Sequence, residues 1–517
     1  MTHVPASLAS EVFQVNATIR RRLRNCKRRI QRRLRPRRWT DQPRPMFRTP
    51  NIQAEIGAKT QGLHCAGLAA CQLLVERLGL APAINRELHL LRRHVPYFES
   101  DHICNLVFNI LANGTTLTDI ELLRNNENYL NALGAQRIPD PTTAGDFLRR
   151  FHAADIETLM RIINEQRLKV WHQQPASFFE CAILEADGTL AATQGECKQG
   201  MDIAYNSVWG YHPLVVSLAN TQEPLFLVNR PGNRPSHEGA AERFDQAIDL
   251  CRRAGFRRIV LRGDTDFALT AHFDRWDTAG VRFVFGLDVM PNLREIVEDL
   301  PRRAWQPLPR PARYTVATTP RQRPTKVKEE LVRQREFENI RLVSEQVAEF
   351  AYRPGRCRQE YRVVVVRKNL SVEKGEQVLF DDIRYFFYIT NDRAMTPTEV
   401  VYFANDRCNQ ENLIEQLKNG IRALRMPTHD LVSNWAYMVI ASLAWSLKAW
   451  LALVQPKADH RQAMLRMEFR TFLRWLVLIP CQLVHTGRRL IYRLLSWNPW
   501  VPVLLATVHD LRRLQFV

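Results

Sequence analysis

The sequence predicts an α/β protein with a mixed-sheet core and a β-rich insertion, preceded by a helical domain and followed by C-terminal helices. Between residues 62 and 174, apolar residues recur three and four positions apart, as on one face of a helix. From about residue 178, short apolar runs separated by Gly, Asn and Pro alternate with helical patterns, which is typical of a mixed sheet. At 517 residues the chain is too long for one core, so two or three domains are expected.

The first 50 residues are strongly basic. They carry 14 Arg and Lys against Glu11 and Asp41, a net +12 out of the chain's +20. Prolines from residue 36 onward prevent one long helix. We therefore expect residues 1–58 to form a disordered arm that lies on the phosphates of a nucleic acid. The arginines expected to contact DNA are Arg20, Arg21, Arg22, Arg28, Arg29, Arg32 and Arg33. The plainer interpretations are a solvated tail, or an extension before a start at Met46.

Cysteine usage and hydropathy indicate the compartment. Ten cysteines include no Cys-x-x-Cys pair, which argues against a zinc module or a disulfide framework and for a reducing cytoplasm. No signal peptide is visible, because arginines rather than an apolar segment follow the N-terminus. The apolar stretch Trp435–Leu447 is too short to span a membrane, so we expect a buried helix there and no membrane partner.

Residues 59–176 are predicted to be a helical DNA-binding domain, although periodicity alone fits an ordinary packing role almost as well. The expected helices are Leu68–Leu80, His102–Leu111 and Ala144–His172. The segment Thr142–Asp146 is interpreted as a helix start with Asp146 in the first turn, where the helix dipole favours an acid.

Residues 177–289 and 381–425 are predicted to be the sheet core. The expected strands are Cys181–Asp187, Leu190–Thr193, His212–Ala219, Pro224–Val228, Arg258–Asp264, Val281–Leu287 and Arg384–Thr390. The expected helices between them are Glu238–Ala254 and Leu269–Ala279. Prolines and charged segments mark residues 290–380 as an insertion subdomain, and residues 426–517 are expected to be a C-terminal helical region. Thr396 and Glu399, with Pro397 between them, predict the start of another helix, patterned to about Leu424.

Three acids in this layout could hold a divalent metal. Asp187 and Asp264 each end a predicted strand, and Glu411 lies on the later helix. Positions 407, 411, 415 and 418 share one face of that helix, so Arg407 and Lys418 would flank the acids. Mg²⁺ prefers carboxylate and water oxygens, and such sites cut phosphodiesters.

Each of these residues also has a plain interpretation. An Asp after a strand is often a turn or capping residue. The four helix residues could be ordinary surface ion pairs. Asp266 competes weakly with Asp264, and Glu415 competes with Glu411, but Glu411 stands four residues after Arg407 and seven before Lys418. His212 is interpreted as a packed strand residue rather than a ligand.

As an ordered set, these motifs resemble the DDE transposases of bacterial insertion sequences, and within them the insertion-sequence family thirteen-eighty. The family's Arg-Ala-Asp-Ser-Gly-Phe-type motif is similar to Arg262–Phe267 here. Its Tyr-Arg-Glu-Lys signature is matched by Arg407, Glu411 and Lys418, with Ala404 in place of the tyrosine. Shorter matches are Thr143–Phe147, Gly210–Leu214, Asn229–Asn233 and Ser433–Tyr437. The resemblance covers roughly residues 60–480.

The resemblance implies an RNase H-like catalytic core in which Asp187, Asp264 and Glu411 hold Mg²⁺, with Mn²⁺ able to substitute. It implies double-stranded DNA as partner, both element ends and target, bound by a homodimer or higher assembly in the bacterial cytoplasm near the nucleoid. Arg407 and Lys418 would hold neighbouring phosphates. The alternatives are a DNA-binding protein of this fold that has lost cleavage, and a plain nuclease.

Overall fold

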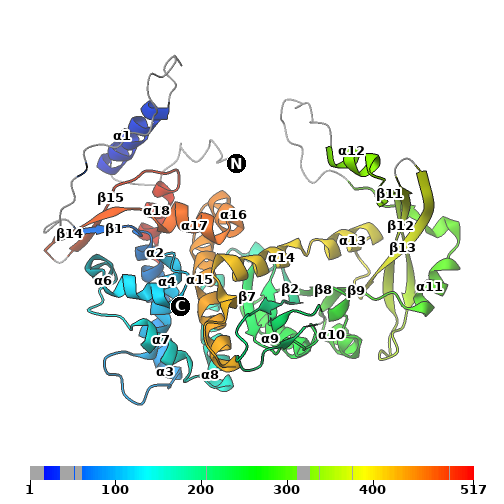
Figure 1. Ribbon diagram of the computed structural model, residues 1–517, viewed down its shortest axis with the longest axis horizontal. Helices are drawn as coiled ribbons and strands as arrows, with labels where there is room; N and C mark the ends of the chain where they lie inside the picture. The colour runs from blue at the N-terminus through cyan, green and yellow to red at the C-terminus, as the bar shows by residue number, and fades with distance from the viewer. Residues whose placement is uncertain are drawn as a thin grey trace.

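A computed structural model shows a nine-stranded mixed sheet with helices packed on it and a large helical region at one end (Figure 1). The structure describes residues 17–34, 52, 61–204, 206–310, 327–336, 338–374, 377–487 and 489–516. The strand order is β10-β11-β12-β13-β9-β8-β2-β6-β7. The strands are β2 (Cys181–Gly188), β6 (Leu214–Leu218), β7 (Glu223–Val228), β8 (Arg258–Gly263), β9 (Arg282–Leu287), β10 (Gln306–Pro307), β11 (Glu338–Tyr352), β12 (Tyr361–Lys374) and β13 (Gln377–Thr390). The prediction of a mixed α/β protein is confirmed.

The centre of the sheet combines two strand directions. Strand β2 is parallel to β8, and β8 is parallel to β9, whereas β6 and β7 continue the sheet antiparallel on the other side of β2. The register places Glu185 of β2 opposite Arg262 of β8. Because β2 and β8 run the same way, the residues at their carboxyl ends lie side by side at one edge of the sheet.

One predicted strand does not join this sheet. Ala191–Ala192 (β3) pairs instead with β5 (Trp209–Tyr211), which also pairs with β4 (Asp202–Ile203) in a separate three-stranded sheet. The predicted strand Leu190–Thr193 is therefore real but shorter and belongs elsewhere. A local apolar pattern specifies a strand but not its partner.

Helices cover the central sheet on opposite faces. Phe244 of α9 (Ala240–Ala254) packs edge-on against Phe285 of β9, with ring centroids 6.2 Å apart. The neighbouring Val284 faces the other way and packs with Val400 and Val401 of α13 (Pro397–Asn405). Successive strand residues point to opposite faces, so α9 and α13 lie on different sides of the sheet.

The capping box that the sequence predicts for α13 is present. The Glu399 amide donates to the Thr396 hydroxyl at 3.3 Å, and the Thr396 amide donates to the Glu399 carboxylate at 2.7 Å. The helix ends at Asn405 rather than continuing to Leu424, and α14 (Cys408–Glu415) follows after a break.

The N-terminal region is helical, as predicted. Its helices are α2 (Leu68–Leu78), α3 (Leu80–Glu87), α4 (Glu99–Leu111), α5 (Ile120–Arg124), α6 (Glu127–Leu133), α7 (Pro141–Leu148) and α8 (Ala153–Trp171). The expected single helix Ala144–His172 is wrong, because α7 and α8 are separate. The expected start is also wrong. Asp140 caps α7 by accepting from the Thr143 amide at 2.9 Å, with Pro141 at the first helical position, so Asp146 is not in the first turn.

The insertion is an extension of the central sheet. β11, β12 and β13 form a long antiparallel ribbon, and β13 also pairs with β9. The predicted boundary between residues 380 and 381 falls inside β13. The ribbon lies well away from the helical region, with α11 (Pro291–Glu298) and α12 (Val327–Gln334) beside it (Figure 1).

The C-terminal region is only partly helical. α15 (Leu431–Leu453), α16 (Ala458–Arg466), α17 (Phe469–Phe472) and α18 (Val501–Leu511) are joined by a hairpin of β14 (Cys481–Thr486) and β15 (Arg489–Leu494). β14 pairs with β1 (Gln61–Leu63) from the other end of the chain. The predicted helical domain and the C-terminal region therefore share one sheet and one core.

Helix α15 runs through the centre of the molecule (Figure 1). It is long and apolar enough to cross a membrane by composition, but that apolar stretch is wholly buried inside the protein. The expectation of a buried helix at Trp435–Leu447 is confirmed.

A buried ion pair joins α15 to the sheet and to α8. Glu223 of β7 accepts from Arg167 Nε at 2.9 Å, from the Trp171 indole at 3.0 Å and from the Trp450 indole at 2.7 Å. Arg167 and Glu223 are 1% and 0% exposed. Three parts of the fold thus meet at one carboxylate.

The basic arm contains a helix where disorder was expected. α1 (Ala17–Leu34) is a single helix, and Leu23, Cys26, Lys27 and Ile30 along one side of it are half-buried. Leu23 packs against the main core, and Lys27 Nζ lies 5.8 Å from the centre of the Trp497 ring. The leucine and isoleucine that interrupt the arginines are therefore a packing face.

Candidate active site

Asp187 and Asp264 lie side by side where β2 and β8 end. Asp187 is the penultimate residue of β2, and Asp264 directly follows β8. The Asp264 side chain also begins the next turn by accepting from the Asp266 amide at 3.1 Å. Their side chains are 18% and 37% exposed. The structure therefore brings together two of the three predicted acids at an accessible edge.

Arg407 lies between these two acids. Its Nη2 is 3.2 Å from Asp264 Oδ2 and 3.6 Å from Asp187 Oδ2. It stands at the N-cap of α14, one turn before Glu411. Its Nε is buried without a partner. A single guanidinium is thus the cation that neutralises both carboxylates in this structure.

Burial has the largest influence on both carboxyl groups. It raises the pKa of Asp187 from 3.8 to about 7; Arg407 opposes this rise, and the charges of Asp264 and Glu411 add to it. Burial also raises the pKa of Asp264, again against Arg407, and Asp266 adds to the rise. Two carboxylates that are hard to ionise together form a site that gains most from a nearby cation.

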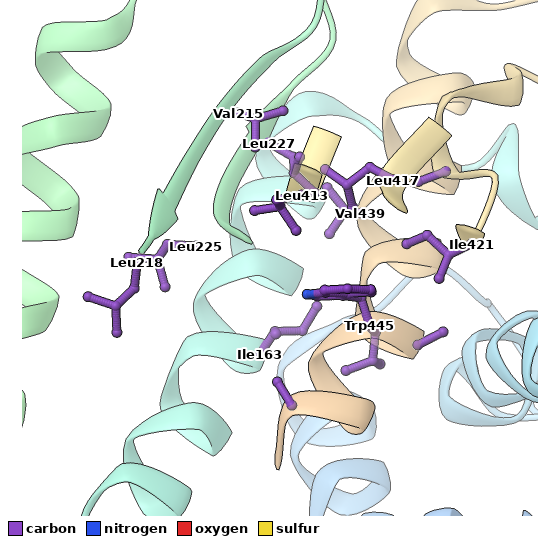
Figure 2. Packing of buried hydrophobic residues seen from close by; sticks show 14 of the residues in the cluster. Ile163, Val215, Leu218, Leu225, Leu227, Leu413, Leu417, Ile421, Val439 and Trp445 are labelled. Atoms are coloured by element: carbon purple, nitrogen blue, oxygen red, sulfur yellow. The ribbon is translucent and has the colours of Figure 1, made fainter. Parts of the chain in front are cut away.

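Helix α14 packs on the sheet over β6 and β7. Figure 2 shows Leu413 and Leu417 close to Val215 of β6 and Leu227 of β7, with Val439 of α15 behind them. Beside this packing, Gln410 is 1% exposed, bonds to the Ser217 hydroxyl and donates to the Val215 carbonyl at 3.3 Å. Periodicity marks Leu413 and Leu417 as core residues, but nothing in the sequence marked Gln410.

Glu411 and Glu415 have different neighbours in the structure. Both are exposed. The charge of Glu411 adds to the rise that burial causes in the pKa of Asp187. Glu415 instead accepts a hydrogen bond from the Asn419 side-chain Nδ2 at 2.7 Å, and its charge opposes the lowering of the pKa of Lys418 by burial. A π-helical turn, Gln416–Gly420, follows α14 and closes with the Ile421 amide on the Gln416 carbonyl at 2.9 Å. Lys418 lies in this turn and is influenced by Asp187 as well.

The three predicted acids are not gathered into one tight cluster. Among the described residues, no group of three or more His, Cys, Asp or Glu side chains stands ready to hold a metal ion. Asp187 and Asp264 form a pair with Arg407, and Glu411 stands apart on the exposed side of α14.

A buried ion pair beneath the aspartates was missed in the sequence. Arg262 Nε donates to Glu185 at 2.7 Å, and Arg262 Nη1 donates to the Phe403 carbonyl at 2.8 Å. Both charged side chains are 1% exposed. Each precedes a predicted acid by two positions on its strand and so shares its face, which is a signal that alternation could have given. The pair ties both strands to the end of α13, just before Arg407.

Two other motif positions have structural explanations. Ala404 is 6% exposed and packs in the apolar cluster with Val284 and Val400, so this position faces the sheet. His212 is buried as predicted but lies between β5 and β6 rather than in a strand, and its Nδ1 lies 2.7 Å from the Arg234 carbonyl oxygen. Its Nε2 would be only 2.8 Å from a Cβ at Gly188, so a glycine beside Asp187 is required by close approach.

The arginines of the arm lie far from these acids. α1 is beside β15 at the end of the molecule, with α15 between it and the ends of β2 and β8 (Figure 1). The side chains of Arg20, Arg21, Arg22, Arg28, Arg29 and Arg32 are exposed, and that of Arg33 lies outside the described residues.

Comparisons with known proteins identify the family. None of the curated proteins matches the chain. A solved structure to which the chain is similar is the "Cryo-EM structure of piggyBac transposase synaptic complex with hairpin DNA (SNHP)", with 12% sequence identity, coverage of 81% of this chain and 86% of that chain, and a TM-score of 0.31. The family model described as "Transposase DDE domain group 1" matches residues 52–516. The chain therefore belongs to the transposases of DDE domain group 1.

Proposed function

We propose that this protein cuts DNA at the ends of its own insertion sequence and joins those ends to target DNA by metal-dependent phosphoryl transfer. The observation that carries the proposal is the pair Asp187 and Asp264 at the ends of adjacent parallel strands, in a chain of this family. The strand order β7-β6-β2-β8-β9, with α9 and α14 on opposite faces, supports an RNase H-like core. The motif Arg407, Glu411 and Lys418 supports insertion-sequence family thirteen-eighty.

The chemistry of the proposed ligands suits Mg²⁺ or Mn²⁺, because all three are carboxylates. Asp187 and Asp264 are oxygen donors held together, and Arg407 already supplies positive charge between them. Glu411, whose charge acts on Asp187, is the proposed third ligand. When bound, such ions activate a water or 3′-hydroxyl and stabilise the leaving oxygen.

The remaining polar residues of the site would hold the DNA. Arg407 and Lys418 flank the acids, and a planar guanidinium can bind a phosphate through two hydrogen bonds. The Glu185–Arg262 pair keeps the two strands and the end of α13 in fixed positions. Both ends of an element must be held together for joining, so we infer a homodimer or larger assembly on DNA, in the bacterial cytoplasm and on the nucleoid.

The choice of Glu411 over Glu415 can be tested directly. We expect Glu411→Gln to slow single-turnover cleavage of a linear DNA that carries the element's terminal repeats by about 10²-fold or more, because it removes a charge used in the transition state. Glu415→Gln is the matched control, and we expect it to stay within a few-fold of the wild type. If Glu415→Gln is inactive while Glu411→Gln cuts, the assignment is wrong.

The arm is proposed to bind phosphates outside the active site. The slope of log K against log salt is negative, and each phosphate contact contributes about −0.9 to it. We therefore expect deletion of residues 1–45 to make this slope less steep. Since Leu23 packs on the core, the deletion also removes an apolar contact. The triple change Arg28→Gln, Arg29→Gln and Arg32→Gln keeps that contact and is the cleaner variant. An unchanged slope in both proteins rules out the arm as a phosphate contact.

A further inference from the structure

Two arginines lie in a tight turn that follows α14 and its π-helical turn. This arginine turn, residues 420–427, connects the π-helical turn to α15. Its apolar side chains are buried except that of Pro427, while Arg422 is half-buried and Arg425 is exposed. The buried residues are Ile421, Ala423, Leu424 and Met426. Packing therefore fixes the turn from inside and leaves the arginines at its surface.

The backbone of the turn is held in a conformation that disfavours side chains. Arg422 has φ 57° and ψ 32°, and Met426 has φ 52° and ψ 65°, both left-handed. Glycine adopts this region without a steric penalty. The turn is held from outside by Lys198 Nζ on the Met426 carbonyl, and by the Thr428 amide on Asn434 Oδ1 at 2.9 Å. An arginine at a position where glycine would be relaxed points to a use for its side chain.

Beside the turn is an open cavity of 420 Å³. It separates the arginine turn and the start of α15 from the helical region. Its lining consists of Thr115, Thr116, Leu117, Thr118, Pro141, Thr142, Arg425, Pro427 and Tyr437. Nearby, Asp119 accepts from the amides of Thr115 and Thr116 at 2.6 and 2.9 Å, so its charge is already satisfied by the loop. The hydroxyls of Thr115 and Thr116 also donate to Asp119, at 3.1 and 3.2 Å, so the charged donor that the lining offers a ligand is the Arg425 guanidinium.

The positive charges of Arg422, Arg425 and Arg470, at and near the arginine turn, repel one another. Burial lowers the pKa of Arg422, and the charges of Arg425 and Arg470 lower it further; Tyr437 and Asp119 oppose this. Arg470 Nη2 lies 3.5 Å from the Asn419 carbonyl oxygen. Within the part of the chain that the structure describes, neither Arg422 nor Arg425 forms an ion pair with an acid. Such a cluster is completed by an anion.

The cluster continues from the active site. Lys418 precedes Arg422 by one turn of chain and is influenced by Asp187. Along the chain, Lys418 is therefore followed by two further cations, Arg422 and Arg425. A DNA strand has regularly spaced phosphates and would meet these cations in order.

We propose that the cavity beside the arginine turn binds a backbone phosphate of the DNA strand that reaches Asp187 and Asp264, with Arg425 as the charged donor in its wall and Arg422 adding positive charge from the same turn. The identification of that strand as substrate rests on the proposed function. Backbone contacts of this kind position DNA without reading its sequence.

The test is salt-dependent binding of a short fluorescent DNA duplex of arbitrary sequence, followed by anisotropy in chelator so that no cleavage is required. We expect Arg425→Gln and Arg422→Gly each to make the negative slope of log K against log salt less steep by about 0.9. Each should also weaken binding roughly 5- to 10-fold at moderate salt. Arg422→Gly should keep or raise the thermal midpoint because it relieves the left-handed arginine. A merely structural arginine would give stability changes without a change in slope.

The matched control is Arg257→Gln. Arg257 is exposed and directly precedes β8, so it lies at the opposite end of that strand from Asp264. We expect its slope and affinity to equal those of the wild type. A wild-type slope for Arg425→Gln would overturn the proposal. Loss of slope in a protein that never cuts DNA would reject the proposed function alone.

Discussion

Asp187→Asn is expected to abolish DNA cleavage while leaving the protein at least as stable as the wild type. The change keeps the shape of the side chain and removes one of two adjacent oxygen-donor charges. We expect a loss of about 10³-fold or more in single-turnover rate, which corresponds to about 4 kcal/mol in the barrier. DNA binding in chelator should not weaken.

The stability half of this prediction follows from the pKa. The pKa of Asp187 is raised from 3.8 to about 7 in the folded protein, mainly by burial. Between these pH values the folded state holds a proton that the unfolded state has released, so this group's contribution to stability falls as pH rises through that window. The asparagine variant lacks this loss. Thermal unfolding in chelator at pH 5 and pH 8 should therefore show a smaller decrease for Asp187→Asn than for the wild type.

Asp266→Asn is the control for this experiment. Asp266 is exposed and is a neighbour of Asp264 in the turn after β8. We expect cleavage within a few-fold of the wild type. Loss in Asp266→Asn equal to that in Asp264→Asn would mean that the wrong acid of that turn was chosen, and full cleavage by Asp187→Asn would exclude the carboxylate mechanism.

Glu223→Gln should give the largest loss of stability, because it leaves Arg167 buried without a counter-charge. Burial already lowers the pKa of Arg167, and Glu223 is the first charge that opposes this. Removing one member of a fully buried pair typically costs about 3–5 kcal/mol. The cost should appear in urea unfolding as a lower midpoint with an unchanged slope.

An exposed ion pair in the same sheet region provides the comparison. Arg234 Nη1 and Glu238 Oε1 are 3.5 Å apart, with side chains 52% and 45% exposed. Glu238→Gln should cost less than about 1 kcal/mol, because water screens such pairs. If Glu223→Gln is no worse than Glu238→Gln, the buried carboxylate does not join α8, β7 and α15 as the contacts indicate.

Local signals determined a large part of this protein. Short apolar runs located the strands that end at Asp187 and Asp264, because a buried strand is encoded in a few successive residues. Thr396, Pro397 and Glu399 located the start of α13, because a capping box closes within four residues. The order of motifs led to the DDE transposases, and the family model confirms that broader assignment.

Only the tertiary structure decided which local elements meet. The pairing of β1 with β14 joins chain segments more than 400 residues apart, which no periodicity encodes. The break between α7 and α8 and the helix in the basic arm depend on surfaces supplied by distant segments. The position of Arg407 between the two aspartates, and of Arg425 beside a cavity lined by the helical region, also required the folded chain. Sequence specifies residue chemistry and local periodicity, whereas charge balance at a site depends on groups brought together only by packing.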